Sequence, residues 1–117
     1  MTKRDTSAYF RHMLTHAQEA AALAGGKARA DLDSDRLLNL ALVRLLEIIG
    51  EAANHIPEDI QSRYPDIPWT QMRSIRNLLI HEYFGVDIDI IWQTITDDLP
   101  DLLKKITAVG YTGNDQR

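Results

Sequence analysis

Residues 35–55, DRLLNLALVRLLEIIGEAANH, decide the fold, because apolar residues recur every three or four positions along the whole stretch. They cover most of the circumference of the expected helix and leave a narrow polar strip of Arg44, Glu47, Glu51 and Asn54. A helix with so much apolar surface must be covered on more than one side. In a chain this short we expect a second copy to supply part of that cover. The alternative is a central helix covered entirely within one subunit.

The flanking segments carry the same helical period, and no segment has a convincing strand pattern. Towards the N-terminus, the sequence predicts a helix that starts at Thr6 or Ser7 and ends at Gly25-Gly26. A loop or mobile connector over 27–33 follows, and Asp33 or Ser34 is expected to cap the helix over 35–55. Apolar positions such as Phe10 and Met13 form the stripe of the first helix. The first half of the sequence therefore predicts two helices joined by a polar connection.

Prolines mark the starts of the elements after residue 55. The expected elements are a short helix over 58–64 begun by Pro57, a helix from about Trp69 to Glu82 begun by Pro68, and a last helix capped by Asp87 that runs to Val109. Pro100 predicts a kink or restart near 97–99. We therefore expect an all-α bundle of about four to five helices forming a single domain over 1–109, with a frayed tail over 110–117.

The composition of the 117 residues excludes several functional classes. There is no cysteine, so disulfides, thiolate metal sites and cysteine nucleophiles are absent. One domain leaves no room for separate cofactor and substrate lobes. A formal charge of −4 disfavours diffuse adhesion to nucleic acid, so any RNA contact should be local. The sequence shows no signal-peptide or membrane-spanning stretch, which predicts a cytoplasmic protein without membrane contact.

The predicted helix over 69–82 combines chemistry-bearing side chains with apolar ones. On a regular helix Arg76 and Tyr83 lie about 20° apart, and Asn77 and His81 about 40° apart, so the four can share one polar face. Arginine suits phosphate oxygens, and histidine exchanges protons near neutral pH. RNA can be cut by its own 2′-hydroxyl if a proton acceptor, a proton donor and positive charge are supplied. Two copies of this face, meeting across a twofold axis, would supply them.

Other interpretations of these polar residues remain open. Arg76, Asn77, His81 and Tyr83 could instead form a buried network paired with Glu47 or Glu51. Among other candidates, His12 and His16 are four residues apart, but a third ligand at suitable spacing is missing, so no metal site is predicted. The sequence has no glycine-rich phosphate loop, and we predict no cofactor.

The string Arg76-Asn77-Leu78-Leu79-Ile80-His81-Glu82-Tyr83 fits the motif R-x-x-x-x-H-x-Y. Together with residues 46–53, 63–65, 67–69, 91–92 and 98–100, it resembles the HepT-like family of HEPN-domain proteins. These are the toxins of type VII (MNT–HepT) toxin–antitoxin systems. The resemblance covers roughly residues 8–109. It implies a helical homodimer with metal-independent endoribonuclease activity, restrained by a minimal nucleotidyltransferase antitoxin.

The same resemblance implies a role for each motif residue. Arg76 would stabilise the scissile phosphate, His81 would transfer a proton, and Asn77 would help to position them. Tyr83 would accept AMP from the antitoxin, which would place anionic nucleotides where RNA phosphate must bind. The alternative is a non-catalytic helical module that binds nucleotides or a nucleotidyltransferase through the same face.

Overall fold

The chain is helical throughout the part that the structure, a computed structural model, describes: residues 2–81 and 87–110, without the side chains of 3, 4 and 77–81. The elements are α1 (Lys3–Ala24), α2 (Asp31–Ser34), α3 (Arg36–Asn54), α4 (Glu58–Arg63), α5 (Trp69–His81), α6 (Ile88–Gln93), the π-helix η1 (Thr94–Asp98) and α7 (Leu99–Val109). Among these residues no strand occurs, so the predicted all-α class is confirmed.

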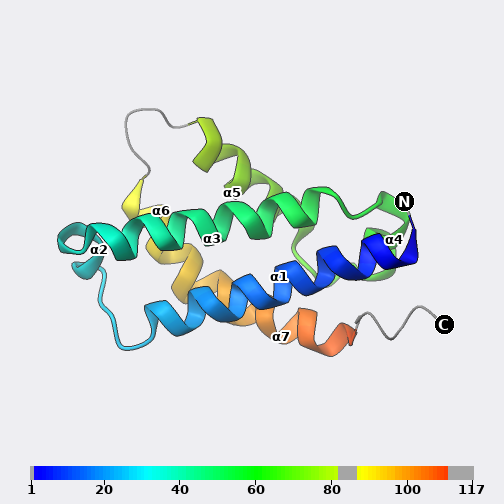
Figure 1. Cartoon of the computed structure of the whole chain (residues 1–117), viewed down its shortest axis with the longest axis horizontal. Helices are drawn as coiled ribbons and strands as arrows, with labels where there is room; N and C mark the ends of the chain where they lie inside the picture. The colour runs from blue at the N-terminus through cyan, green and yellow to red at the C-terminus, as the bar shows by residue number, and fades with distance from the viewer. Residues whose placement is uncertain (1, 82–86, 111–117) are drawn as a thin grey trace.

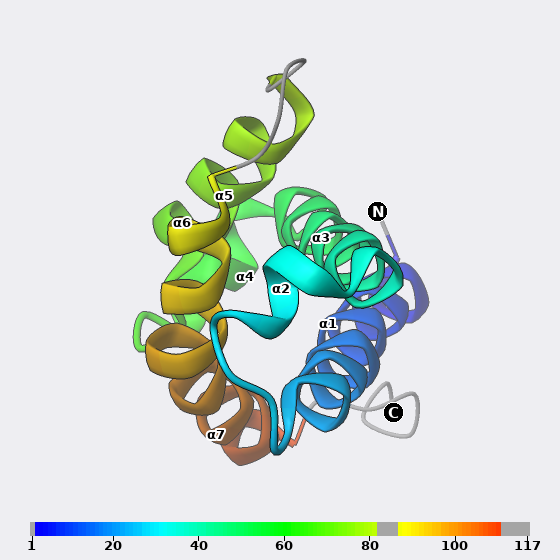
Figure 2. The ribbon, with the colours of Figure 1, turned by 90° about the vertical axis from the view of Figure 1, so that its left-hand side faces the viewer.

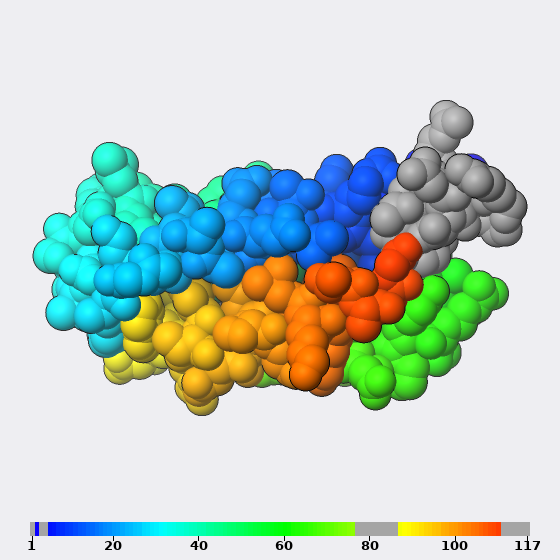
Figure 3. All heavy atoms as spheres, turned by 90° about the horizontal axis from the view of Figure 1, so that it is seen from below, coloured from blue at the N-terminus to red at the C-terminus, as the bar shows by residue number. Residues whose placement is uncertain are grey.

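Helix α3 is the central element of the bundle. It packs against α1 on one side and α5 on the other, as the view along the bundle shows (Figure 2). Helix α7 returns along α1, and the two lie side by side when the molecule is seen from below (Figure 3). Figure 1 shows α5 on the far side of α3 from α1 and α7. The segment 35–55 is therefore covered on two sides by helices of its own chain.

The core consists of the apolar stripes of these helices. Phe10 and Met13 of α1 are buried in this core, and the ring of Trp69 meets Phe10 edge to face with centroids 6.0 Å apart. The Trp69 indole N–H donates to the Tyr64 carbonyl at 3.0 Å, so the polar atom of this large side chain is satisfied. Trp69 thus joins the start of α5 to the bundle.

The predicted start of α1 was wrong. Thr2, not Thr6 or Ser7, caps the helix: its hydroxyl accepts from the Asp5 amide at 3.1 Å, and the Asp5 carboxylate accepts from the Thr2 amide. This reciprocal arrangement satisfies two end groups at once, which a single hydroxyl cap cannot do. Thr6 and Ser7 are buried inside the helix instead. The predicted end at Gly25 is confirmed.

The connection over 27–33 also differs from the prediction, because it contains the short helix α2. Helix α3 is capped by Asp35, whose carboxylate accepts from the Leu38 amide at 3.1 Å, and not by Asp33 or Ser34. Asp33 lies inside α2 and bonds to Arg29. The acidic residue nearest the apolar run therefore makes the cap.

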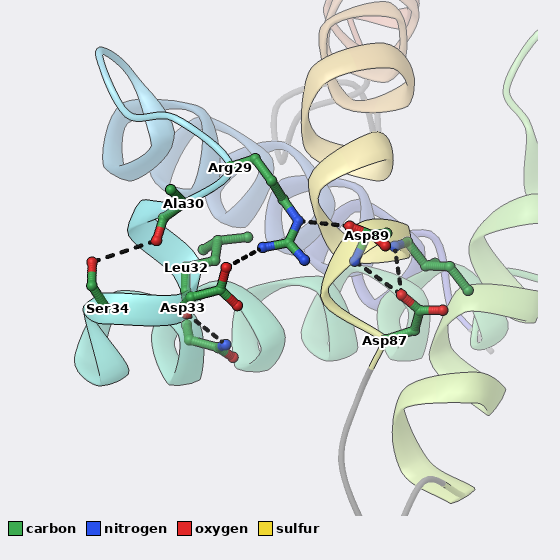
Figure 4. A network of polar contacts seen from close by, with 9 residues as sticks. Arg29, Ala30, Leu32, Asp33, Ser34, Asp87 and Asp89 are labelled. Carbon is green, nitrogen blue, oxygen red and sulfur yellow. Dashed lines mark hydrogen bonds and ion pairs between the residues drawn. The ribbon is translucent and has the colours of Figure 1, made fainter.

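Arg29 holds α2 and α6 together. Its Nη1 lies 2.7 Å from Asp33 Oδ2, and its Nε lies 2.7 Å from Asp89 Oδ1 (Figure 4). Asp87 caps α6 as predicted, since its carboxylate accepts from the Asp89 amide at 2.9 Å. The two ion pairs of Arg29 hold the start of α6 in place, directly after the segment of the sequence that contains Tyr83.

Pro100 produces the predicted interruption as a stretch of π-helix. Proline lacks an N–H and its ring crowds the carbonyl four residues earlier, so a regular helix cannot continue through it. The turn widens over Thr94–Asp98, and α7 begins at Leu99. The buried positions Ile95, Leu99 and Leu102 still face the core after the interruption.

The outer side of α3 is not completely covered. Leu37 is 79% exposed and Leu40 is 51% exposed, whereas Leu38 and Leu42 are buried. The chain therefore covers most of α3, but two large apolar side chains near its start remain in contact with solvent. Complete coverage within one subunit, the alternative considered above, is contradicted.

Candidate active site

Helices α3 and α5 come into very close contact at Gly50. A β-carbon on Gly50 would overlap the β-carbon of Arg76 and would stand 2.9 Å from the Met72 carbonyl oxygen. Only a residue without a side chain permits this approach. Gly50 thereby sets the position of Arg76 against the polar strip of α3.

Arg76 is held by Glu51, the residue that follows Gly50. Its Nε and Nη2 lie 2.8 Å and 2.7 Å from Glu51 Oε2. The predicted alternative partner, Glu47, pairs with Arg44 instead, at 3.3 Å. The Arg76 side chain is 28% exposed, so the guanidinium is oriented by the fold and still reaches solvent. The ion pair between Arg76 and Glu51 is therefore not sealed from solvent, and this geometry allows Arg76 a role in substrate binding.

Glu51 also holds a second side chain, which the sequence analysis did not single out. His55 Nε2 lies 3.1 Å from Glu51 Oε1, and the imidazole stacks on the Tyr9 ring with centroids 4.9 Å apart and planes 7° apart. The four-residue spacing between Glu51 and His55 was the available signal, because such residues are neighbours on a helix. The contact with Tyr9 could not be found in this way, since it depends on how α1 packs against α3.

A surface hollow of about 410 Å³ lies beside this group, between α1 and α3. Its lining residues are Tyr9, His12, Arg44, Glu47, Ile48, Glu51, Ala52 and His55. Charged, imidazole and aromatic side chains thus surround an open space next to the Glu51 carboxylate that holds Arg76.

The charge state of Glu51 reflects its two partners. Burial alone would raise the pKa of the Glu51 carboxyl. Hydrogen bonds from His55 and Arg76, together with their positive charge, outweigh burial and hold the pKa below its ordinary value. The ionised carboxylate therefore binds both neighbours at neutral pH.

The variant Glu51→Gln is expected to be less stable than the wild type at pH 7, by at most about 1 kcal/mol because the ion pair is half-exposed. A lowered pKa in the folded state gives stability that is present above the ordinary pKa of 4.5 and lost as pH falls below it. Urea unfolding of both proteins between pH 7 and pH 3 should therefore show the difference shrinking towards zero. A difference that stays constant down to pH 3 would contradict the ionised Glu51 pair.

The remaining motif residues are described only in part. The described part of α5 ends at His81, close to the predicted end. The side chains of Asn77 and His81, and all of Tyr83, lie outside the described residues. Their predicted shared face with Arg76 stays a prediction.

Two further findings concern the described residues alone. Over residues 2–81 and 87–110, no group of three or more histidine, cysteine, aspartate or glutamate side chains is arranged to hold a metal ion. Within the same ranges, no helix has both the length and the apolar character needed to cross a membrane.

Comparison with known proteins identifies the family. The family model described as "Ribonuclease HepT-like" matches residues 13–109. "Putative RNase MJ1380" of Methanocaldococcus jannaschii is 33% identical over 109 residues, which are 93% of this chain and 100% of that protein. "Putative RNase TTE0752" of Caldanaerobacter subterraneus is 37% identical over 101 residues, 86% of this chain and 90% of that protein. No solved structure matches significantly.

A further relative carries the family name itself. "Probable ribonuclease HepT" of Thermococcus cleftensis is 45% identical over 75 residues, which are 64% of this chain and 68% of that protein. These matches confirm the resemblance to the HepT-like family. They also confirm, at the level of the family, the expectation of an RNA-cleaving enzyme. The chain belongs to the HepT-like ribonuclease family.

Proposed function

We propose that this chain is a metal-independent endoribonuclease and the toxin of a type VII (MNT–HepT) toxin–antitoxin system. Membership of the HepT-like ribonuclease family supports the RNA substrate. The observation that carries the proposal is Arg76, which Glu51 holds in a fixed orientation while 28% of its side chain stays exposed. A preorganised guanidinium on the surface is suited to the negative charge of a phosphate that is being cleaved.

The proposed reaction uses the 2′-hydroxyl of RNA as the nucleophile. Its oxygen forms a bond to phosphorus as it loses its proton, and the bond from phosphorus to the 5′-oxygen breaks as that oxygen gains a proton. The products are a 2′,3′-cyclic phosphate and a 5′-hydroxyl end. Arg76 stabilises the charge that gathers on the phosphate, and His81 transfers a proton, with Asn77 in a positioning role.

Two controls test this chemistry directly. The purified protein should cut RNA in the presence of EDTA, and it should leave the same sequence uncut when every ribose is replaced by 2′-deoxyribose. A requirement for a divalent ion, or equal cleavage of the deoxy substrate, would contradict the 2′-hydroxyl mechanism. Tight binding of RNA without any cleavage would favour the non-catalytic module.

The active form is proposed to be a homodimer. The support is the exposed pair Leu37 and Leu40, three residues apart on α3, since neighbouring exposed apolar side chains form the kind of patch that marks a contact site. They lie on the same helix as Glu51, at its opposite end. A twofold contact along α3 would bring two copies of the Arg76 group into one assembly.

The wild type is expected to sediment as a dimer at micromolar concentration, and the double variant Leu37→Glu/Leu40→Glu as a monomer. Four negative charges, two from each subunit, brought together in an apolar contact cost far more than such a contact gains. The variant Thr107→Glu adds a charge on the exposed side of α7 and should leave the dimer intact. A dimeric double variant would exclude this surface as the contact.

The proposed antitoxin is a minimal nucleotidyltransferase that transfers AMP from ATP to the Tyr83 hydroxyl, which loses its proton as pyrophosphate leaves. Bulky anionic groups near Arg76 would compete with RNA phosphate, which explains why such a modification would inhibit cleavage. Mass spectrometry of the protein, produced with and without the gene beside it, should show increases in steps of one AMP. The Tyr83→Phe variant should lack them. A tight but unmodified complex would support inhibition by occlusion alone.

A further inference from the structure

The proposed reaction needs two proton transfers, but the motif contains a single histidine. One group must take the proton of the 2′-hydroxyl and another must protonate the 5′-oxygen. His81 can do one of these. A second imidazole, that of His55 at the C-terminal cap of α3, is linked to Arg76 through Glu51, because the two side chains bind the two oxygens of the same carboxylate.

Glu51 brings the two groups together through its two oxygens. Oε2 accepts from Arg76 at 2.8 Å, and Oε1 lies 3.1 Å from His55 Nε2. An ionised carboxylate only accepts hydrogen bonds, so Nε2 of His55 carries the hydrogen in this pair. In the neutral ring the lone pair is then on Nδ1, which is the form needed to accept a proton.

The surroundings of His55 fit a group that reacts with a substrate. Its side chain is 45% exposed and lines the hollow of about 410 Å³, so a nucleotide can reach it. Stacking on Tyr9 restrains the plane of the ring. A carboxylate on one nitrogen and a fixed ring plane are the features that orient a histidine base in other enzymes.

The charged and titratable groups around the ring come from two helices. Among the described residues, Glu51 bonds to it from α3, the helix that His55 caps, and Tyr9 stacks on it from α1. His12, Arg44 and Glu47 line the same hollow. Glu51 is the only one of these that bonds to the ring in the described part of the chain, so its carboxylate sets the tautomer.

We propose that His55 is a second catalytic residue, the base that takes the 2′-hydroxyl proton at Nδ1 while Arg76 holds the adjacent phosphate. His81 then supplies the proton for the departing 5′-oxygen. This inference rests on the proposed ribonuclease function. Each subunit thus carries both a base and an acid on the two helices that meet at Gly50.

The test compares His55→Gln and His81→Gln on two RNA substrates. The first is an ordinary oligoribonucleotide, and the second carries a sulfur in place of the 5′-oxygen at a bond that the wild type cuts. The sulfur departs as a thiolate and needs no acid. Glutamine at 55 keeps an N–H donor for Glu51 but cannot transfer a proton.

Both variants are expected to cut ordinary RNA about 10²–10⁴-fold more slowly than the wild type. On the sulfur substrate His81→Gln should recover to near the wild-type rate, whereas His55→Gln should stay slow. The acidic limb of the pH–rate profile should also disappear in His55→Gln. The control His16→Gln removes a histidine outside the hollow, whose Nδ1 lies 2.6 Å from the His12 carbonyl oxygen, and should change neither rate.

The possible failures are distinguishable. If the wild type and Arg76→Ala cut RNA equally, or neither cuts it, the proposed function fails. If the wild type cuts RNA and His55→Gln is within about twofold of it, only the role of His55 is overturned. If the sulfur substrate restores His55→Gln, His55 acts as the acid and the assignment as base is wrong. Equal melting temperatures for wild type and variant would exclude loss of folding as the cause of a slow rate.

Discussion

The variant Arg76→Ala is expected to lower kcat/KM for RNA cleavage by about 10²–10³-fold or more, the loss typical of removing one donor that stabilises charge in a transition state. The guanidinium is held ready by Glu51 at 2.7–2.8 Å, so it needs no rearrangement to meet the phosphate. Cleavage of a labelled oligoribonucleotide in EDTA measures the effect. Arg76→Lys should recover little of the activity, because an ammonium cannot reproduce the planar fork.

A matched control lies three residues earlier on the same helix. Arg73 is also partly buried, but it bonds to Gln61 Oε1 at 2.8 Å and takes no part in the Glu51 group. Arg73→Ala should therefore keep kcat/KM within about threefold of the wild type, because the hydrogen bonds that it loses, to Gln61 and Thr70, lie outside the Glu51 group. Equal losses in the two variants would mean that Arg76 contributes to folding and not to the reaction.

Gly50→Ala is expected to destabilise the protein by about 2–3 kcal/mol, in spite of the gain of roughly 1 kcal/mol that alanine normally brings to a helix. The added carbon would overlap the Arg76 β-carbon and stand 2.9 Å from the Met72 carbonyl. Neither atom can move away by a change of rotamer, so α5 must shift as a whole. The melting temperature should fall by about 10 °C, and RNA cleavage should fall with it at temperatures where the variant is folded.

Gly25→Ala is the matched control for this substitution. Gly25 has an ordinary φ of −58°, and an added carbon there would make only van der Waals contacts, at 3.4 Å or more. Its stability should change by less than about 0.5 kcal/mol. If both alanine variants had the same melting temperature as the wild type, the tight crossing of α3 and α5 at Gly50 would be disproved.

The sequence predicted the helices wherever a local signal was unambiguous. Asp87 caps α6 and Pro68 precedes the first residue of α5, both as predicted. The cap of α3 was predicted wrongly, because Asp33, Ser34 and Asp35 are adjacent and all able to cap, and the structure uses Asp35. The start of α1 was missed because Thr2, Thr6 and Ser7 are all able to cap. The choice depends on burial: Thr6 and Ser7 pack into the bundle, which leaves Thr2 at the exposed end.

The candidate site could be predicted from the sequence only in part. Pairing of Arg76 with Glu47 or Glu51 followed from the polar strip of α3, and the structure selects Glu51. The selection depends on the close crossing at Gly50, which periodicity cannot predict. His55 was missed because its significance arises from sharing a carboxylate with a residue 21 positions later on another helix.

The wide turn over Thr94–Asp98 has a consequence for how this fold tolerates changes in chain length. Such a turn accommodates one residue more than a regular helix does, and the extra residue is absorbed locally. Ile91 before it and Leu102 after it therefore both remain buried. A relative with one amino acid fewer at this point can close the wide turn into a regular one and keep the same interior, so alignments of the last helix should permit a single gap here.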